Sequence, residues 1–266
     1  MAHEPPRLTI SKLQRMKRSG DKIAMLTAYD YTMAAILDAA GVDVLLVGDS
    51  LAMVVQGHET TLPVSVRDMV YHAEMVVRGS QRALVVVDLP FPHGQLGPRR
   101  TIQVAARMMK RSGCQAVKLE GGAQQAATIA ALVDAGIPVI AHVGLRPQSI
   151  HALGGYRVQR DEEKLQADAL AAQQAGAFCV LMECVPAPLA AQITKQLDVP
   201  TIGIGAGNAC DGQVLVTHDL LGMTLGKRPR FARAFADVGR QIETAAKNYI
   251  AAVRTGEFPS TAEAFE

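Results

Sequence analysis

The stretch ALVVVD (Ala83–Asp88) shows the pattern that decides the fold, because an unbroken apolar run ends abruptly in an acid. A strand with one face in water alternates apolar and polar residues, whereas a strand covered on both faces is apolar throughout. Short runs of the same kind recur on both sides of this stretch, so the sequence predicts a parallel sheet covered by helices. The predicted strands are Ile23–Thr27, Val44–Val47, Ala83–Val87, Ala116–Leu119, Val139–His142, Cys179–Met182, Thr201–Ile204 and Val214–Val216.

Amphipathic, alanine-rich segments separate these runs. Regular alternation of strands and helices is typical of α/β proteins, and eight parallel strands are the number that closes a barrel. The sequence therefore predicts an α/β fold of the (β/α)8 TIM barrel type, with a doubly wound open sheet as the competing arrangement. The predicted helices are Tyr31–Ala40, Ser65–Gly79, Ile102–Ser112, Gln124–Ala135, Glu162–Ala175 and Pro188–Gln196.

No proline- or serine-rich linker divides the 266 residues, and barrels of about 250 residues form one unit. We therefore expect a single barrel domain over residues 1–266, with Met1–Pro6 as an N-terminal extension. A helical pattern at Lys12–Arg18 precedes the first strand and is expected to close the bottom of the barrel. A long helical pattern from Arg233 to Arg254 carries apolar positions that indicate packing against the barrel or against another subunit.

The composition excludes several classes of partner. The formal net charge is only +2, the basic residues are scattered, and aromatic residues make up 4% of the chain without any Trp, so no nucleic acid is expected as a partner. The first ten residues, MAHEPPRLTI, lack the apolar core of a secretory signal, and no run approaches the roughly 18 apolar residues of a membrane span. The four cysteines form no CxxC pair. We expect a cytoplasmic protein with reduced thiols and no membrane partner.

Ionisable side chains follow several of the predicted strands. The C-terminal ends of the strands form the working face of a (β/α)8 barrel, so these side chains are expected to meet there. Each acid alone has an ordinary explanation as a helix cap or a turn residue. Several carboxylates around one small opening repel one another unless a positive charge lies between them. The residues at these positions are Tyr29, Asp30, Asp49, Ser50, Asp88, Lys118, Glu120, His142 and Glu183.

A divalent cation would balance these acids. All candidate ligands are oxygens, which favours a hard ion, Mg²⁺ before Zn²⁺. Asp49 and Asp88 are the best pair of direct ligands, and Glu120 is expected to act through water or simply to pair with Lys118. His142 is expected either to hydrogen-bond to a residue that itself binds the metal or the substrate, or to contact the substrate directly.

Two further features remain open on the residues alone. Lys118 could form a Schiff base, but acids on either side favour a permanently charged lysine that holds a substrate carboxylate. The segment GIGAGN (Gly203–Asn208) is not the Gly-x-Gly-x-x-Gly pattern of dinucleotide folds. It could hold a phosphate after the seventh strand, although we expect it to keep the floor beneath a ligand free of side chains.

Several longer segments carry a resemblance to a known family. In order along the chain, and covering it from about Leu8 to the C-terminal helix, they resemble ketopantoate hydroxymethyltransferases. The segments are VGDSLAMVVQGHETTLPV (Val47–Val64), VDLPF (Val87–Phe91), VKLEGG (Val117–Gly122), HVGLRPQS (His142–Ser149), GGYRVQ (Gly154–Gln159), MECVP (Met182–Pro186) and IGIGAGNACDGQVLVTHD (Ile202–Asp219).

The resemblance implies a fold, a reaction and roles for particular residues. The fold would be a (β/α)8 barrel of the phosphoenolpyruvate mutase/isocitrate lyase kind, and the reaction the transfer of a one-carbon unit from 5,10-methylenetetrahydrofolate to 3-methyl-2-oxobutanoate. The chains would assemble into large homo-oligomers, commonly decamers. The implied roles are metal and keto-acid binding for Asp49 and Ser50, metal and substrate binding for Asp88, substrate contact for Lys118, membership of the metal site for Glu120, and proton acceptance for Glu183.

One segment departs from the family pattern. The VDLPF segment is usually followed by small polar residues, whereas this chain continues with PHGQLGPRR (Pro92–Arg100). The departure leaves the metal site untouched but puts the loop contacts, and with them the affinity for folate, in question.

The implied chemistry accounts for these residue types. The proton on C3 of the keto acid is too weakly acidic to leave unaided, so a Mg²⁺-stabilised enolate and a general base, Glu183, are needed. Three other interpretations stay open. The first is a different Mg²⁺-dependent keto-acid lyase or mutase on the same barrel, although its cysteine-containing lid motif is not found here. The second is a non-catalytic barrel that binds the keto acid, and the third is a purely structural oligomer, in which the ring of acids would have no purpose.

Overall fold

A computed structural model describes residues 7–226 and 228–265 of the chain. Within these residues, eight parallel strands follow one another in sequence order, and β8 pairs with β1 to close a barrel. The predicted (β/α)8 barrel is confirmed, and the open sheet is excluded. The strands are β1 (Ile23–Thr27), β2 (Val44–Val47), β3 (Leu84–Asp88), β4 (Ala116–Glu120), β5 (Val139–Gly144), β6 (Cys179–Glu183), β7 (Thr201–Ile204) and β8 (Gly212–Leu215).

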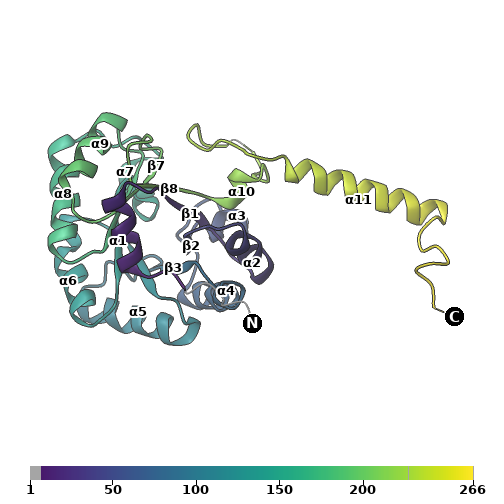
Figure 1. Ribbon diagram of the computed structural model, residues 1–266, viewed down its shortest axis with the longest axis horizontal. Helices are drawn as coiled ribbons and strands as arrows, with labels where there is room; N and C mark the ends of the chain where they lie inside the picture. The colour runs from purple at the N-terminus through teal and green to yellow at the C-terminus, as the bar shows by residue number, and fades with distance from the viewer. Residues whose placement is uncertain (1–6, 227, 266) are drawn as a thin grey trace. The chain divides into compact units, whose positions relative to one another are not determined.

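Helices surround the strands on the outside of the barrel (Figure 1), and α2, α4, α5, α6, α8 and α9 pack on one another in this order. Four helices, α1, α2, α4 and α8, begin at a residue whose side chain caps the first turn. Ser65 and Asp68, for example, form a reciprocal capping box at the start of α4. The elements outside the strands are α1 (Ile10–Ser19), α2 (Tyr31–Ala39), α3 (Leu51–Val54), α4 (Val66–Gly79), α5 (Pro98–Ser112), η1 (Ala123–Gln125), α6 (Ala126–Asp134), η2 (Pro147–Ser149), α7 (Ile150–Leu153), α8 (Glu162–Gln174) and α9 (Ala187–Gln196).

Two apolar clusters explain why the strands are apolar on both faces. Alternate residues of β3 belong to different clusters: Val85 and Val87 pack outward against the helices, whereas Leu84 and Val86 fill the barrel interior. The next interior position after Val86 is Asp88, at the C-terminal end of the strand. The same step from apolar to ionisable occurs on neighbouring strands, so the barrel interior is apolar below and polar at its top.

Some element boundaries differ from the predictions. β5 extends to Gly144, so His142 lies inside the strand rather than at its end. β8 is Gly212–Leu215 and not Val214–Val216, because its glycine pairs with β1 and β7 at positions where composition suggested a turn. α5 begins at Pro98, whose fixed backbone angle suits a first helical position. The unusual segment Pro92–Arg100 therefore includes the first residues of a helix.

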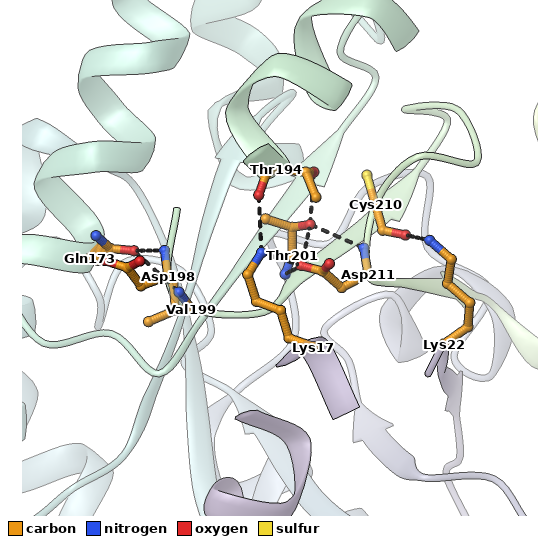
Figure 2. Close-up of polar contacts among 9 residues, drawn as sticks. All are labelled: Lys17, Lys22, Gln173, Thr194, Asp198, Val199, Thr201, Cys210 and Asp211. Carbon is orange, nitrogen blue, oxygen red and sulfur yellow. Dashed lines mark hydrogen bonds and ion pairs between the residues drawn. The ribbon is translucent and has the colours of Figure 1, made fainter. Parts of the chain in front are cut away.

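α1 packs on the N-terminal end of the barrel, as predicted, and its Leu13 and Met16 join the interior cluster. Its Lys17 Nζ lies 2.8 Å from Oδ2 of Asp211 and donates to the carbonyl of Thr194 at 3.0 Å. The same Asp211 oxygen accepts hydrogen bonds from the backbone N–H of Thr201 at 2.8 Å and from its hydroxyl at 3.0 Å (Figure 2). Polar contacts thus join α1 to the segments that begin β7 and β8.

Residues from Thr217 onward form a second compact unit. It contains α10 (Thr217–Leu220) and α11 (Val238–Thr255). The long helix was predicted to begin at Arg233, but the backbone N–H groups of Phe235 and Val238 donate to carbonyls next to α10 instead of to a preceding helical turn. The single-domain description of residues 1–266 stays a prediction. Within the described residues, no helix is long and apolar enough to cross a membrane.

Candidate active site

The polar layer at the top of the barrel comes from consecutive strands in register. Asp88 of β3 pairs with Lys118 of β4, and Glu120 of β4 pairs with His142 of β5. Glu183 ends β6 opposite Gly144 of β5. Since side chains alternate across a strand, all five of these residues take interior positions, which bring their side chains into one ring above the apolar layer. Asp49 joins them from the turn that follows β2, where its backbone N–H donates to Oδ2 of Asp88 at 3.0 Å.

Lys118 is the positive centre of this ring. Its Nζ lies 3.0 Å from Oδ1 of Asp88 and 3.1 Å from Nδ1 of His142, and the lysine side chain is only 5% exposed. Burial alone would lower the pKa of Lys118, but the nearby carboxylates, Asp88 foremost, outweigh it and raise the pKa above its ordinary value. The lysine is therefore held charged, which favours the binding of a substrate anion over nucleophilic attack.

His142 is held neutral beside that lysine. Burial and the Lys118 charge lower the pKa of His142 well below its usual range. An ammonium group can only donate, so Nδ1 of His142 accepts from it and Nε2 carries the ring hydrogen. Nε2 lies 3.2 Å from Oε2 of Glu183 but is not aligned for a hydrogen bond, and no residue in the described chain supplies one. A buried donor is thus left for a ligand or for a small shift of Glu183.

Glu183 has the surroundings of a general base. Burial raises its pKa to about 7, and the opposing effect of Lys118 is smaller. A carboxylate with that pKa can accept a proton near neutral pH and release it again. Its side chain is 14% exposed, so it remains reachable from the opening. The residue after it, Cys184, has a φ of 51°, a left-handed conformation that is rare outside glycine and turns the chain sharply away from the site.

Asp49 and Glu120 are buried carboxylates that share one partner. Burial and then the charge of Asp88 raise the pKa of Asp49 to about 7, and burial and then Asp49 raise that of Glu120. The amide Nε2 of Gln148 donates to Oδ2 of Asp49 at 2.8 Å, and the Gln148 backbone N–H donates to Oε2 of Glu120 at 3.1 Å. The sequence prediction missed Gln148 as a site residue, although it lies in the quoted HVGLRPQS segment.

The acids fit a cation that completes its shell with water and substrate. Oε1 of Glu120 is a buried acceptor without a hydrogen-bond donor in the residues that the structure describes, and Oδ1 of Asp88 is met by the ammonium group of Lys118 at 3.0 Å. Over the same residues, no group of three or more His, Cys, Asp or Glu side chains is arranged to hold a metal by itself. Mg²⁺ usually takes one or two carboxylates and keeps several waters, so its demands match this arrangement.

Ser50 and the glycine-rich segment complete the comparison with the predicted site. The hydroxyls of Ser50 and Tyr29 lie 2.8 Å apart, and a side chain at Gly48 would meet both the Ser50 hydroxyl and Oδ2 of Asp88. A side chain at Gly203 would meet Sγ of Cys210, and one at Gly207 would meet Ala187. These two glycines therefore allow β7 and its loop to pack closely against neighbouring elements, rather than clearing a floor under a ligand.

A closed barrel with a buried lysine, a neutral histidine and four carboxylates at the C-terminal ends of its strands has the architecture of a TIM-barrel enzyme that acts on a small polar substrate. The family model described as ketopantoate hydroxymethyltransferase matches residues 7–261. The chain belongs to this family, and it is a transferase of the phosphoenolpyruvate mutase/isocitrate lyase-like fold.

Individual relatives agree with the family model. The 3-methyl-2-oxobutanoate hydroxymethyltransferase of Rhodopirellula baltica is 62% identical over 98% of this chain and 97% of its own length. The enzyme of the same name from Halorhodospira halophila is 55% identical over 97% of this chain and 95% of its own. Among solved structures, 2,3-dimethylmalate lyase, a member of the PEP mutase/isocitrate lyase superfamily, shares the fold with a TM-score of 0.60 and 20% identity, covering 96% of this chain and 91% of that chain.

Proposed function

We propose that this enzyme transfers a one-carbon unit from 5,10-methylenetetrahydrofolate to 3-methyl-2-oxobutanoate, giving 2-dehydropantoate for pantothenate biosynthesis. The names of its close relatives support the keto-acid substrate. The observation that carries the chemistry is Glu183, a carboxylate with a pKa of about 7 that borders buried polar atoms lacking protein partners. The four cysteines are free and buried, which suits the reducing cytoplasm where we place the reaction.

Asp49 and Asp88 would hold Mg²⁺, with Glu120 contributing through water. When bound, the ion would stabilise negative charge that develops on the keto oxygen of the substrate. The unpartnered oxygen of Glu120 supports this assignment, because buried acceptors normally find a donor or a cation. The raised pKa of Asp49, caused by burial and then by the charge of Asp88, is consistent with a carboxylate that a cation would stabilise.

Lys118 binds the carboxylate of the keto acid. An ammonium group has three donor hydrogens, and Asp88 and His142 account for two of them. The third is free for the substrate. His142 supplies its Nε2 hydrogen to Glu183 or to a substrate oxygen, because that hydrogen has no partner in the described residues. Ser50, steadied by Tyr29, contributes a further hydroxyl to the keto acid.

Glu183 removes the proton from C3 of the bound keto acid. Water replaces the two carbon–nitrogen bonds of the 5,10-methylene group, so that tetrahydrofolate leaves with a hydrogen on each of N5 and N10 and the carbon is released as formaldehyde. The electron pair left on C3 then forms the new carbon–carbon bond to this carbon, and the aldehyde oxygen takes up the proton held by Glu183 to become the hydroxyl of the product. Glu183 must come within about 2.6–3.2 Å of the proton-bearing atom for the first step. The partly exposed Phe91 and Leu96, in and beside the unusual Pro92–Arg100 segment, offer apolar surface beyond β3 for the folate.

The chain is also proposed to form a homo-oligomer, a decamer by its family resemblance. α11 carries Ile242, Tyr249, Ile250 and Val253 on one face, at helical spacing, and its own unit buries none of them. Within its unit the face contacts the ring of Phe258 through Tyr249 but stays exposed. A helix with an exposed apolar face is expected to pack on another element, as amphipathic helices do.

The Glu183→Gln variant tests the proposed base. In deuterium oxide with Mg²⁺, the wild-type protein should exchange the C3 proton of 3-methyl-2-oxobutanoate, and the variant should lose this exchange by about 10²–10⁴-fold while still binding the keto acid. Glu162→Gln, an exposed residue in the first turn of α8, is the matched control and should exchange normally. Full exchange by Glu183→Gln would remove Glu183 from the base role.

Product analysis separates the proposed reaction from the competing lyase or mutase. The proposed enzyme forms 2-dehydropantoate only when 5,10-methylenetetrahydrofolate is present. A lyase or mutase would act on a keto acid without folate, and a non-catalytic binding barrel would form no product at all.

A further inference from the structure

Gln148 makes hydrogen bonds to residues at or just beyond the ends of three consecutive strands, β2, β3 and β4. It lies in η2, beyond β5, and is 6% exposed. Its Nε2 donates to Oδ2 of Asp49, which follows β2, at 2.8 Å and to the carbonyl of Leu89, which follows β3, at 2.9 Å. Its backbone N–H donates to Oε2 of Glu120, the last residue of β4, at 3.1 Å.

The orientation of the Gln148 amide follows from its partners. Both groups near Nε2, a carboxylate and a carbonyl, can only accept hydrogen bonds, so the nitrogen must face them. The amide oxygen then points the other way, where Nε2 of Gln95 lies 3.4 Å from it. Both amide hydrogens are therefore used, and neither is available to a substrate.

A neutral amide suits this position better than a charged group. A lysine or arginine here would compete with a cation for the carboxylates, and an acid would add to their repulsion. Gln148 instead occupies one oxygen of Asp49 and one of Glu120, and Oε1 of Glu120 is one of the buried acceptors left without a donor. The second oxygen of each carboxylate remains for another ligand.

We propose that Gln148 is a positioning residue for the cation site: by holding one oxygen of Asp49 and one of Glu120, it sets the carboxylates so that their other oxygens can serve Mg²⁺. This role rests on the proposed function. Gln148 acts through the two carboxylates and not through contact with the substrate. Its replacement should therefore lower the affinity for Mg²⁺ rather than change the proton-transfer step.

The test measures metal binding directly. Mg²⁺ is titrated calorimetrically into the wild-type protein, Gln148→Met and Gln148→Glu, each in the presence of 3-methyl-2-oxobutanoate. Gln148→Met keeps the length and the backbone N–H but loses both donors, and should bind Mg²⁺ about tenfold more weakly. Gln148→Glu keeps the shape, adds repulsion beside Asp49, and should bind more weakly still. Gln124→Leu, an exposed glutamine in η1, is the control and should match the wild type.

Activity at varied Mg²⁺ gives a second readout. The Mg²⁺ concentration for half-maximal activity should rise in both Gln148 variants, while kcat at saturating Mg²⁺ returns to within about threefold of the wild type. Mg²⁺ affinities equal to that of the wild type in folded variants would overturn the role of Gln148 alone. Failure of both variants to fold would overturn it too, and assign Gln148 to stability. An absence of Mg²⁺ binding by the wild type would overturn the proposed metal site itself.

Discussion

At the scale of single residues, the chemistry depends on which proton each buried group carries. Lys118 stays charged because carboxylates surround it, and burial together with that charge lowers the pKa of His142 and keeps it neutral. Asp88 pairs directly with the positive charge of Lys118. At Glu183 the effect of Lys118 is smaller than that of burial, so the pKa of Glu183 rises to about 7. The ring thus contains one fixed cation, one neutral donor and two carboxylates, Glu183 and Asp49, that can change their protonation near neutral pH.

The raised pKa of Glu183 predicts the pH dependence of proton abstraction. Only the ionised carboxylate can accept the C3 proton, so the exchange rate should rise as the pH increases through about 7 and level off above it. A glutamate with an unshifted pKa would already be fully active at pH 6. The measurement is the C3 deuterium exchange of 3-methyl-2-oxobutanoate at saturating Mg²⁺, from about pH 5.5 to 8.5. A flat profile over this range would contradict the role assigned to Glu183.

Acids at strand ends could be found from the sequence, but Gln148 could not. Asp88 and Glu183 each end an apolar run, and that abrupt change marks the end of a barrel strand. Gln148 lies in a loop turn with no such signal, and its importance comes from contacts with residues 99 and 28 positions away in the chain. Lys118 and His142 could be placed near strand ends from the sequence, but their contacts could not be predicted, because these depend on strand registers that the sequence does not specify.

At the scale of elements, close approach between β5 and β6 sets the position of Glu183. Gly144 ends β5 with a φ of 90°, and its backbone passes directly beside the carbonyl of Glu183 and the side chain of Val185. The backbone N–H of Leu145 then donates to that carbonyl at 2.9 Å. The end of β6 is therefore held at a distance that leaves no room for a side chain on β5.

Replacing Gly144 by alanine should therefore harm activity more than a comparable change elsewhere. Its Cβ would clash with Glu183 and Val185, and the positive φ adds strain, so we expect a loss of about 2–4 kcal/mol in the free energy of unfolding together with slower proton abstraction. Gly136→Ala is a matched control, because Gly136 also has a positive φ of 78° but open space around it. Urea unfolding and C3 exchange test both variants. Equal effects would show that strain, not the approach to Glu183, decides.

The opposite end of the barrel predicts a loss of stability without a loss of chemistry. Asp211 accepts hydrogen bonds from Lys17 and Thr201, and the acid and the lysine are 15% and 14% exposed. Asp211→Ala would leave the backbone N–H of Thr201 without its acceptor and Lys17 without its carboxylate, with only the Thr194 carbonyl remaining for the lysine, so we expect unfolding to become easier by about 2–4 kcal/mol. Lys17→Met should cost less, because its stem still packs, and the exposed Lys12→Met should cost nothing measurable. Urea unfolding measures all three, and a neutral Asp211→Ala would contradict this view of α1.

Predicted element boundaries were wrong where local chemistry competed with periodicity. The pattern from Arg233 continues in the helical register, but hydrogen bonds of Phe235 and Val238 to the chain beside α10 prevent a helix before Val238. α5 begins earlier than its apolar pattern because Pro98 starts the helix one turn ahead. Both errors involve the ends of elements, where a local backbone constraint or a hydrogen bond to another segment outweighs the periodic pattern.

At the scale of the whole molecule, stability and chemistry occupy different layers of the same barrel. One apolar cluster fills the barrel interior below the polar ring, and the other lies between the strands and the helices. Neither cluster includes a residue of the polar ring. This separation was foreseeable from the sequence, because it needs only apolar strands that end in ionisable residues. The sequence indicated assembly only as one of two alternatives, because an apolar helical face can pack on the barrel of the same chain or on another subunit.

The apolar face of α11 predicts how the assembly can be broken. Ile242 and Ile250 are 53% and 44% exposed and lie on the same side of the helix. Replacing both by lysine places charges on a face that must lose water when subunits associate, so the molecular mass in solution should fall below that of the wild-type oligomer. Replacing Thr244 and Asn248, on the opposite side, by lysine adds the same charge and should leave the mass unchanged. Light scattering after size-exclusion chromatography measures both. A wild-type protein that runs as a monomer, or an unchanged mass in the Ile242/Ile250 variant, would contradict assembly through α11.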